Sequence, residues 1–206
     1  MIDWVVIVPV KRFADAKTRL EPAQDRAALA EALTRDTLDA VASSPRVRML
    51  LVITDDPRLV DDLRLPVAAV IRTQQSPGLN GAISDGLIYA AESWPDYGVA
   101  VLLGDLPALT AEDLEQTLAS AEGFALGVVP DATGRGTVLI TALPGVPLVP
   151  AFGEDSAGRH LELGHRFIRA PERLRRDVDT PADLTAAVRL GVGRHTAAVL
   201  GVPATA

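Results

Sequence analysis

The stretch Trp4-Val5-Val6-Ile7-Val8-Pro9 is short, apolar and rich in β-branched residues, so it predicts a buried strand. Further apolar runs of similar length predict more strands, at residues 47–53, 67–71, 99–103, 124–129 and 137–142. Helical patterns separate most of these runs. Alternating strands and helices at this length predict an α/β domain with a mostly parallel sheet flanked by helices.

The helical patterns are defined by apolar spacing and by capping residues. Residues 23–42 are rich in Ala and Leu and carry apolar side chains at helical spacing. Three further helices are expected to begin at polar caps, which are Asn80, Thr110 and Thr180. No linker divides the chain, so residues 1–206 are expected to form a single domain. The tail at 191–206 is expected to be peripheral, with a short helix at 196–200.

The composition narrows the function classes. The chain has 206 residues and a formal net charge of −7, which argues against a general binder of nucleic acid or membrane surfaces. No stretch reaches the ~18 uninterrupted apolar residues of a transmembrane helix, and the N-terminus lacks the basic region of a secretory signal. The chain contains no cysteine, so thiolate zinc sites and cysteine nucleophiles are excluded, and a cytoplasmic location is expected.

The loop after the first strand carries both lysines of the chain. Lys11 and Lys17 are the only lysines among 20 basic residues, and Arg12 and Arg19 lie in the same loop. Ligands of such sheets bind beyond the carboxyl ends of the strands, and a compact ammonium group suits a phosphate. The loop has neither a P-loop signature nor the glycine pattern of a dinucleotide site. We therefore predict a triphosphate site on Lys11 and Lys17; the alternative is a solvated basic loop.

Two acidic motifs are candidates for a metal site. Asp105 lies in Gly-Asp-Leu-Pro, directly after the run at 99–103, where its carboxylate could hold Mg²⁺. Asp179, in the stretch Asp177-Val178-Asp179-Thr180-Pro181, is the predicted second ligand, and an extended backbone would turn Asp177 the same way. The alternatives are a turn or cap at the first motif, and ion pairs with the preceding arginines at the second.

Glycine-rich segments in the C-terminal half indicate a second, smaller anionic substrate. Gly134-Arg135-Gly136-Thr137 can turn backbone N–H groups toward a negative charge. Ser156 is expected to cap a short helix that ends at Leu163, and a helix N-terminus favours an anion. The alternatives are an ordinary hairpin turn and an ordinary helix cap.

The stretch Ser76–Ala82 could read a nucleotide base through its backbone and the amide of Asn80, or Asn80 could serve only as a helix cap.

The histidines are poor catalytic candidates. His160 and His165 are five positions apart and do not share a helix face, and no H-E-x-x-H motif occurs.

Taken in order, these motifs resemble those of a known family. They are Val8-Pro9-Val10-Lys11, Ala16-Lys17-Thr18-Arg19-Leu20, Gly78-Leu79-Asn80, Gly104-Asp105-Leu106-Pro107, Gly136-Thr137, Phe152-Gly153 with Ser156 and His160, and Asp177-Val178-Asp179-Thr180-Pro181. Over residues 4–190 the chain resembles the 2-phospho-L-lactate guanylyltransferase family (CofC/FbiD) of coenzyme F-420 biosynthesis, in its bacterial phosphoenolpyruvate guanylyltransferase branch. The two aspartate motifs are shared by many nucleotidyltransferases of the same Rossmann-like fold, so they indicate only the superfamily.

The resemblance implies transfer of GMP from GTP to a small phosphorylated three-carbon acid, with release of pyrophosphate. The acid is phosphoenolpyruvate in the bacterial branch, 2-phospho-L-lactate in archaeal relatives and 3-phosphoglycerate in some others. By this resemblance Asp105 and Asp179 would bind Mg²⁺. Thr137, Gly153 and Ser156 would hold the acid, although the family often has Asn where this chain has Val138. The nucleotide would contact Val8, Pro9, Val10, Lys11, Lys17, Gly78 and Asn80, with Lys11 and Lys17 acting on the triphosphate.

Two other functions remain open at this stage. One is a nucleotidyltransferase with another base or acceptor, such as a cytidylyl- or molybdopterin-type enzyme, although the missing glycine-rich loop counts against it. The other is a non-catalytic nucleotide-binding protein, against which the intact aspartates and lysines argue. A homodimer and transfer of the product to the next enzyme of the pathway are further expectations. Nucleic acid and membranes are not expected as partners.

Overall fold

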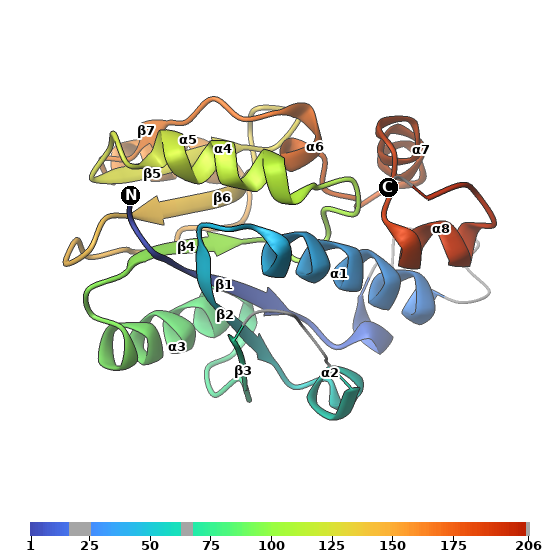
Figure 1. Cartoon of the computed structure of the whole chain (residues 1–206), viewed down its shortest axis with the longest axis horizontal. Coiled ribbons are helices and arrows are strands. Elements are labelled where there is room, and N and C mark those ends of the chain that lie inside the picture. Colours follow the sequence, from blue (N-terminus) through green and yellow to red (C-terminus); the bar gives the residue numbers. More distant parts are fainter. Residues whose placement is uncertain (17–25, 63–67, 205–206) are drawn as a thin grey trace.

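The protein folds around one central sheet (Figure 1). The computed structural model describes residues 1–16, 26–62 and 68–204, and within them seven strands form one sheet in the order β3-β2-β1-β4-β6-β5-β7. The strands are β1 (Trp4–Val10), β2 (Val47–Thr54), β3 (Ala68–Arg72), β4 (Gly98–Leu102), β5 (Leu126–Pro130), β6 (Thr137–Ala142) and β7 (Arg166–Phe167). Strands β1 to β4 are mutually parallel, whereas β6 runs antiparallel between β4 and β5. The predicted mostly parallel α/β fold is confirmed.

Helices cover both faces of this sheet, as Figure 1 shows. They are η1 (Phe13–Asp15), α1 (Arg26–Ser43), α2 (Pro57–Asp62), α3 (Gly78–Ser93), α4 (Ala111–Ala121), α5 (Ser156–Glu162), α6 (Glu172–Arg175), α7 (Pro181–Leu190) and α8 (Arg194–Leu200). Side chains of α1 and α4 pack into one apolar cluster and those of α3 into another. None of the helices in the described part of the chain is long and apolar enough to cross a membrane.

Strand β1 is buried on both faces, which explains its unbroken apolar sequence. Val6 and Val8 pack in the cluster shared with α1, whereas Val5 and Ile7 pack in the cluster shared with α3. Successive side chains of a strand point to opposite faces, so a central parallel strand needs apolar residues at every position. The carboxyl end of β1 therefore leaves the core at a fixed place, where the Lys11 loop begins.

Two of the predicted helix starts are capping boxes. The Thr110 hydroxyl accepts a hydrogen bond from the Asp113 backbone N–H, and the Asp113 carboxylate accepts one from the Thr110 backbone N–H. Thr180 and Asp183 form the same reciprocal pair at the start of α7. These caps satisfy N–H groups that would otherwise lack partners at the helix start. The second box also fixes where the Asp177–Asp179 stretch ends.

Two other predicted caps are wrong. Helix α3 begins at Gly78 with Pro77 as its N-cap, so Asn80 lies inside the first turn. Helix α5 begins at Ser156 itself, and its N-cap is Asp155 in the left-handed conformation. Neither helix has a side-chain cap, and the polar side chain of Asn80 is used elsewhere in the fold. Because Asn80 does not cap α3, its side chain is free to make the contacts described below for the candidate site.

The segment after Gly191 is packed against α1 at the right of Figure 1, on the side toward which β1 points. Val192 and Ala197 are buried in a third apolar cluster with Leu29 and Leu33 of α1. The buried Asp36 carboxylate accepts hydrogen bonds from two backbone N–H groups at the start of α8. Residues 191–204 thus lie outside the sheet but are anchored to the helix that borders the candidate site.

Candidate active site

A cavity of about 690 Å³ lies at the carboxyl ends of β1 and β4. Because these two strands are parallel neighbours, the loops that follow them meet at the same edge of the sheet. Its lining comes mainly from the loops after β1 and β4, the start of α3 and the stretch at 177–179, with further residues from α1 and from the segments after β2 and β3. The lining includes six of the residues that were predicted to bind the nucleotide or the metal: Pro9, Val10, Lys11, Gly78, Asp105 and Asp179. Val8 lies in the core behind it, and Lys17 lies outside the described residues.

Three of the carboxylates that line this cavity come from the two acidic motifs. Asp105, Asp177 and Asp179 all line it, and the backbone N–H of Val178 donates to the Asp105 carbonyl at 3.2 Å, which joins the two acidic motifs. Burial, together with the neighbouring charges of Asp105, Asp179 and Asp131, raises the pKa of Asp177 to about 7. Neighbouring carboxylates repel one another when they are charged, and a bound cation would relieve this repulsion.

The donor set suits a hard divalent cation. Carboxylate oxygens are the ligands that Mg²⁺ prefers, and Mg²⁺ is usually held by one or two carboxylates together with substrate phosphates. Among the described residues, no three or more acidic or histidine side chains are grouped so that they could hold a metal ion. A metal here would therefore need oxygens from a bound phosphate as well.

The loop that carries Asp105 is held from α1. The Thr37 hydroxyl, fully buried, donates to the Leu33 carbonyl and accepts from the Leu106 backbone N–H, both at 2.9 Å. The Gly193 backbone N–H donates to the Pro107 carbonyl at 3.0 Å. Hydrogen bonds on both sides of the turn thus set the position from which the Asp105 side chain extends.

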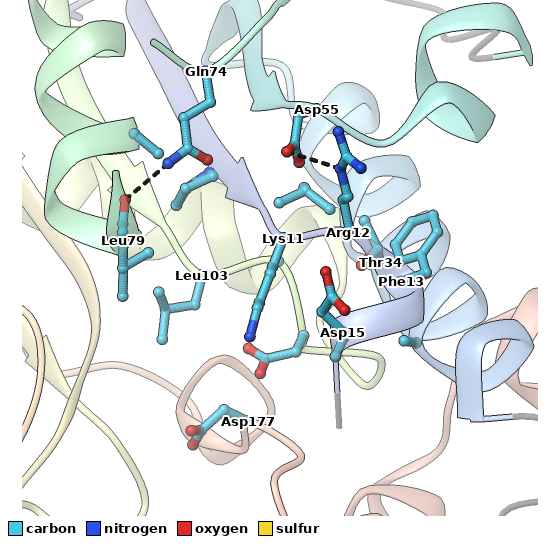
Figure 2. A pocket seen from close by; sticks show the side chains of 18 of the residues that line it. Lys11, Arg12, Phe13, Asp15, Thr34, Asp55, Gln74, Leu79, Leu103 and Asp177 are labelled. Carbon is cyan, nitrogen blue, oxygen red and sulfur yellow. Dashed lines mark hydrogen bonds and ion pairs between the residues drawn. The ribbon is translucent and has the colours of Figure 1, made fainter. Parts of the chain in front are cut away.

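Lys11 is the basic side chain that reaches into the cavity from the described part of the β1 loop. Figure 2 shows its ammonium group on the side of Asp177, whereas Arg12 turns away to Asp55. The Arg12 and Asp55 side chains form an ion pair at 2.8 Å. The Asp56 carboxylate accepts from the Phe13 backbone N–H at 2.8 Å, which fixes the loop two residues beyond Lys11. The cavity is therefore lined by a lysine as well as by carboxylates.

The wall on the α3 side is formed by Gln74, Gly78 and Leu79. The Asp85 carboxylate holds this loop, because it accepts from the backbone N–H groups of Gln75 at 2.7 Å and Ser76 at 2.8 Å, and from the Ser76 hydroxyl. Burial works against the charged form of Asp85, but these hydrogen bonds outweigh it and lower its pKa. No local sequence pattern marks Asp85, since its partners lie nine and ten positions away.

Gly81 explains the close contact between this loop and α3. A Cβ atom at residue 81 would lie 2.9 Å from the Ser76 carbonyl carbon, which is closer than real Cβ atoms come to other heavy atoms. Only glycine allows the helix and the loop to approach this closely. Gly81 is thus required by the close approach of α3 to the loop that forms the cavity wall.

The predicted acceptor residues lie beside the cavity and do not line it. Thr137 opens β6 and is buried, and the carbonyl of the next residue, Val138, accepts from the backbone N–H of the cavity-lining Leu103 at 3.0 Å. Gly153 has φ +127°, and Ser156 is buried at the start of α5. The structure thus places Thr137 next to the loop that follows β4, and the Ser156 backbone N–H donates to the Gly153 carbonyl at 3.3 Å.

The Gly134–Thr137 segment forms the turn between β5 and β6, so the hairpin interpretation of its glycines is confirmed. This turn is joined to α5. The Arg135 side chain pairs with Asp155 at 2.8 Å, and the Ala157 backbone N–H donates to the Arg135 carbonyl at 3.0 Å. The hydrogen bond from Arg135 lowers the pKa of Asp155, although both side chains are exposed.

Asn80 does not line the cavity. Its amide donates to the Phe152 carbonyl at 3.0 Å and accepts from the Phe152 backbone N–H at 2.9 Å. Both polar groups of the side chain are therefore bonded to the loop before α5. Sequence reasoning could not find this pair, because its members are 72 positions apart.

The chain matches a known family and is similar in sequence to known proteins. The family model described as "Guanylyl transferase CofC like" matches residues 4–200. A relative from Thermomonospora curvata, phosphoenolpyruvate guanylyltransferase, is 43% identical over 202 residues, which cover 96% of this chain and 89% of the relative.

Solved structures support the fold. A putative nucleotide-diphospho-sugar transferase from Desulfovibrio desulfuricans G20 superposes with a TM-score of 0.69 at 18% identity, over 92% of this chain and 87% of that one. A Mycobacterium tuberculosis H37Rv protein in complex with manganese has a TM-score of 0.52 at 18% identity, over 92% of this chain and 99% of that one. The extent of the family match and the identity to the T. curvata relative decide the assignment: the chain is a nucleotidyltransferase and belongs to the CofC-like guanylyl transferase family.

Proposed function

We propose that the protein transfers GMP from GTP to phosphoenolpyruvate, releases pyrophosphate, and acts in the cytoplasm in coenzyme F-420 biosynthesis. The observation that carries this proposal is the cavity that Lys11 lines together with Asp105, Asp177 and Asp179. The name of the T. curvata relative supports the choice of phosphoenolpyruvate as acceptor. The remaining acids, 2-phospho-L-lactate and 3-phosphoglycerate, are alternatives that the experiment below separates.

In this proposal Asp105 and Asp179 hold Mg²⁺, and Asp177 adds negative charge beside them. A bound Mg²⁺ supplies charge neutralisation at the phosphates and helps to orient them. The manganese complex of the M. tuberculosis fold neighbour is in keeping with a divalent ion in this fold. Lys11, with Lys17 from the part of the loop outside the described residues, would neutralise the triphosphate.

The chemistry needs no general base from the protein. A phosphate oxygen of the acid, already ionised at neutral pH, forms a bond to the α-phosphorus of GTP. The bond between that phosphorus and the bridging oxygen of the β-phosphate breaks, and pyrophosphate leaves with the electron pair. The residues act by orienting two anions in line and by neutralising their charge. Val8, Pro9, Val10, Gly78 and Asn80 would shape the nucleotide side, and Thr137, Gly153 and Ser156 would bind the acid.

The test is pyrophosphate release with Mg²⁺, in which GTP, ATP and CTP are each combined with the three acids. The reaction is coupled to the next transferase so that an unstable product does not accumulate. Release with GTP and phosphoenolpyruvate alone is expected. Release with another pair would replace the substrates named here, and silence with every pair would overturn the proposal.

A matched pair of variants tests the metal site in the same assay. Asp105→Ala should abolish release and leave the fold intact, whereas Asp96→Ala should release pyrophosphate at the wild-type rate. Asp96 is exposed and precedes the amino end of β4, while Asp105 follows the carboxyl end of the same strand. Near-wild-type turnover in Asp105→Ala would contradict the assignment of this carboxylate.

A further inference from the structure

His160 connects the predicted acceptor residues through both of its ring nitrogens. The ring is fully buried in α5. Its Nδ1 lies 3.1 Å from the Thr137 hydroxyl oxygen, and its Nε2 accepts a hydrogen bond from the Ala151 backbone N–H at 3.1 Å. Phe152 contacts the ring edge-on, with 5.1 Å between centroids. One side chain thus touches both the start of β6 and the loop that leads to Gly153.

The partners of the ring determine where its proton lies. A backbone N–H can only donate, so Nε2 next to Ala151 must be the unprotonated nitrogen. Burial, and the neighbouring His165, lower the pKa of His160 to about 4, and the ring is therefore neutral at neutral pH. The single ring proton then lies on Nδ1, where both the Thr137 hydroxyl oxygen and the Ser156 backbone carbonyl can accept it, so the Thr137 hydroxyl cannot donate to this nitrogen.

This tautomer leaves Thr137 as a donor. A hydroxyl group has one hydrogen and two lone pairs, so an oxygen that accepts from His160 still has its own hydrogen to give. Thr137 precedes Val138, which is bonded to the cavity-lining Leu103. An anionic oxygen that arrives beside the cavity would receive the hydrogen of this hydroxyl. His160 therefore selects the direction in which Thr137 donates.

The loop at 151–153 is held from two sides. His160 accepts from the backbone of Ala151, and Asn80 makes its pair of hydrogen bonds to the backbone of Phe152. Asn80 belongs to α3, whose first residues Gly78 and Leu79 line the cavity. The backbone before Gly153 is therefore fixed relative to the nucleotide side of the site, because Asn80 and His160 bond to consecutive residues.

We propose that His160 is a positioning residue for the acceptor: it orients the Thr137 hydroxyl as a donor and fixes the loop that carries Gly153. The inference rests on the proposed function, because it takes the acidic substrate to bind at Thr137, Gly153 and Ser156. His160 itself donates no proton to the reaction and touches no reacting atom. The effect of its loss should therefore fall on the acceptor and not on GTP.

The experiment compares His160→Phe, His160→Gln and a matched control, His165→Phe. His165 is equally buried, with its ring centroid 5.2 Å from that of His160, but its Nδ1 donates to the Gly127 carbonyl and to none of the acceptor residues. Glutamine keeps one donor and one acceptor on a side chain of similar length. For each protein, the KM for phosphoenolpyruvate, the KM for GTP and kcat are measured by pyrophosphate release.

His160→Phe should raise the KM for phosphoenolpyruvate by about tenfold, the loss expected for one hydrogen bond of ~1.4 kcal/mol, while the KM for GTP changes by less than about twofold. His160→Gln should recover most of this loss, and His165→Phe should leave both KM values near wild type. A Thr137→Val variant should show the same acceptor-selective change. The double variant Thr137→Val with His160→Phe should be little worse than either single variant, because both substitutions remove the same oriented donor, the Thr137 hydroxyl.

Three outcomes would overturn the inference. The first is an unchanged KM for phosphoenolpyruvate in His160→Phe, or in Thr137→Val if the first variant does not fold. The second is an equal rise in both KM values. The third is the same acceptor effect in His165→Phe, since that would indicate loosened packing alone. A wild-type protein that releases no pyrophosphate with any acid would overturn the proposed function itself, which separates the two failures.

Discussion

The hydroxyl of Thr37 offers a direct test of how the fold holds the Asp105 loop. Thr37→Val keeps the shape of the side chain and removes the hydroxyl that accepts from the Leu106 backbone N–H at 2.9 Å. The Leu33 carbonyl, to which the hydroxyl donates, retains its ordinary helical hydrogen bond. The Leu106 N–H is buried and would lose its partner, which costs roughly 1–3 kcal/mol in a protein interior.

The assay is urea unfolding of both Thr37→Val and a control, with the free energy of unfolding as the measured quantity. In thermal unfolding the same loss should appear as a fall of roughly 2–12 °C in Tm, because each 1 kcal/mol corresponds to about 2–4 °C for a chain of this length. Thr117→Val is the control. Thr117 is buried equally deeply in α4, but its hydroxyl only donates, to the Asp113 carbonyl one turn earlier. Its removal leaves no donor without a partner, and its cost should be close to zero.

Thr37→Val should also lower kcat for pyrophosphate release, because Leu106 follows Asp105 directly. A difference of less than about 0.5 kcal/mol between the two variants would refute the reasoning. So would a destabilised Thr37→Val protein with the kcat of wild type, since the loop would then keep its position without the hydroxyl.

Further predictions concern the cavity wall and the buried titrating groups. Gly81→Ala should raise the KM for GTP severalfold, because its Cβ would lie 2.9 Å from Ser76, whereas Gly158→Ala, with nothing within 4 Å, should leave the KM unchanged. The folded-state pKa of Asp177 lies above its ordinary value of 3.8, so the contribution of this carboxyl group to the stability of the metal-free protein should fall as pH rises from about 4 to 7, by at most ~1.4 kcal/mol per pH unit. Urea unfolding across this range should show a smaller loss in Asp177→Asn, and an equal loss would contradict the assignment. His160 has the opposite sign, since its folded-state pKa lies below 6.5: its contribution is present above pH 6.5 and is lost as pH falls toward 4, a slope that His160→Gln should reduce.

Much of the fold could be predicted because the signals are local. The apolar run at the start of the chain, and the capping boxes at Thr110 and Thr180, each depend on residues within six positions of one another. Strand β7 has two residues and α6 has four, which is too short for any periodicity to show. Their positions depend on packing against distant elements, and the sequence pattern does not contain that information.

The sequence predicts which charged residues come to the cavity more readily than it predicts their contacts. Lys11 and Asp105 could be placed at this cavity because each follows a buried strand and such residues come to one edge of a parallel sheet, whereas Asp179 follows no buried strand and was predicted from the pair of aspartates before the Thr180 cap. The role of Asn80 could not be predicted, because a polar residue at a helix start satisfies a capping pattern whether or not a distant backbone binds it first. Asp177 is more buried than Asp179, the other aspartate of the second acidic motif, and this burial depends on how the loop packs against Asp105.

The Asp105 loop shows why local patterns specify which residues form the site but not their positions. Three separate segments hold its backbone: α1 through Thr37, the second acidic motif through Val178, and the residue before α8 through Gly193. The last two segments lie more than 70 positions beyond Asp105 in the sequence. A carboxylate after a buried strand is therefore sufficient to predict a cation site, whereas its distance from the other carboxylates depends on contacts made by the C-terminal third of the chain. The positions of α7 and α8 on α1 are thus part of the geometry of the site, although neither helix lines the cavity.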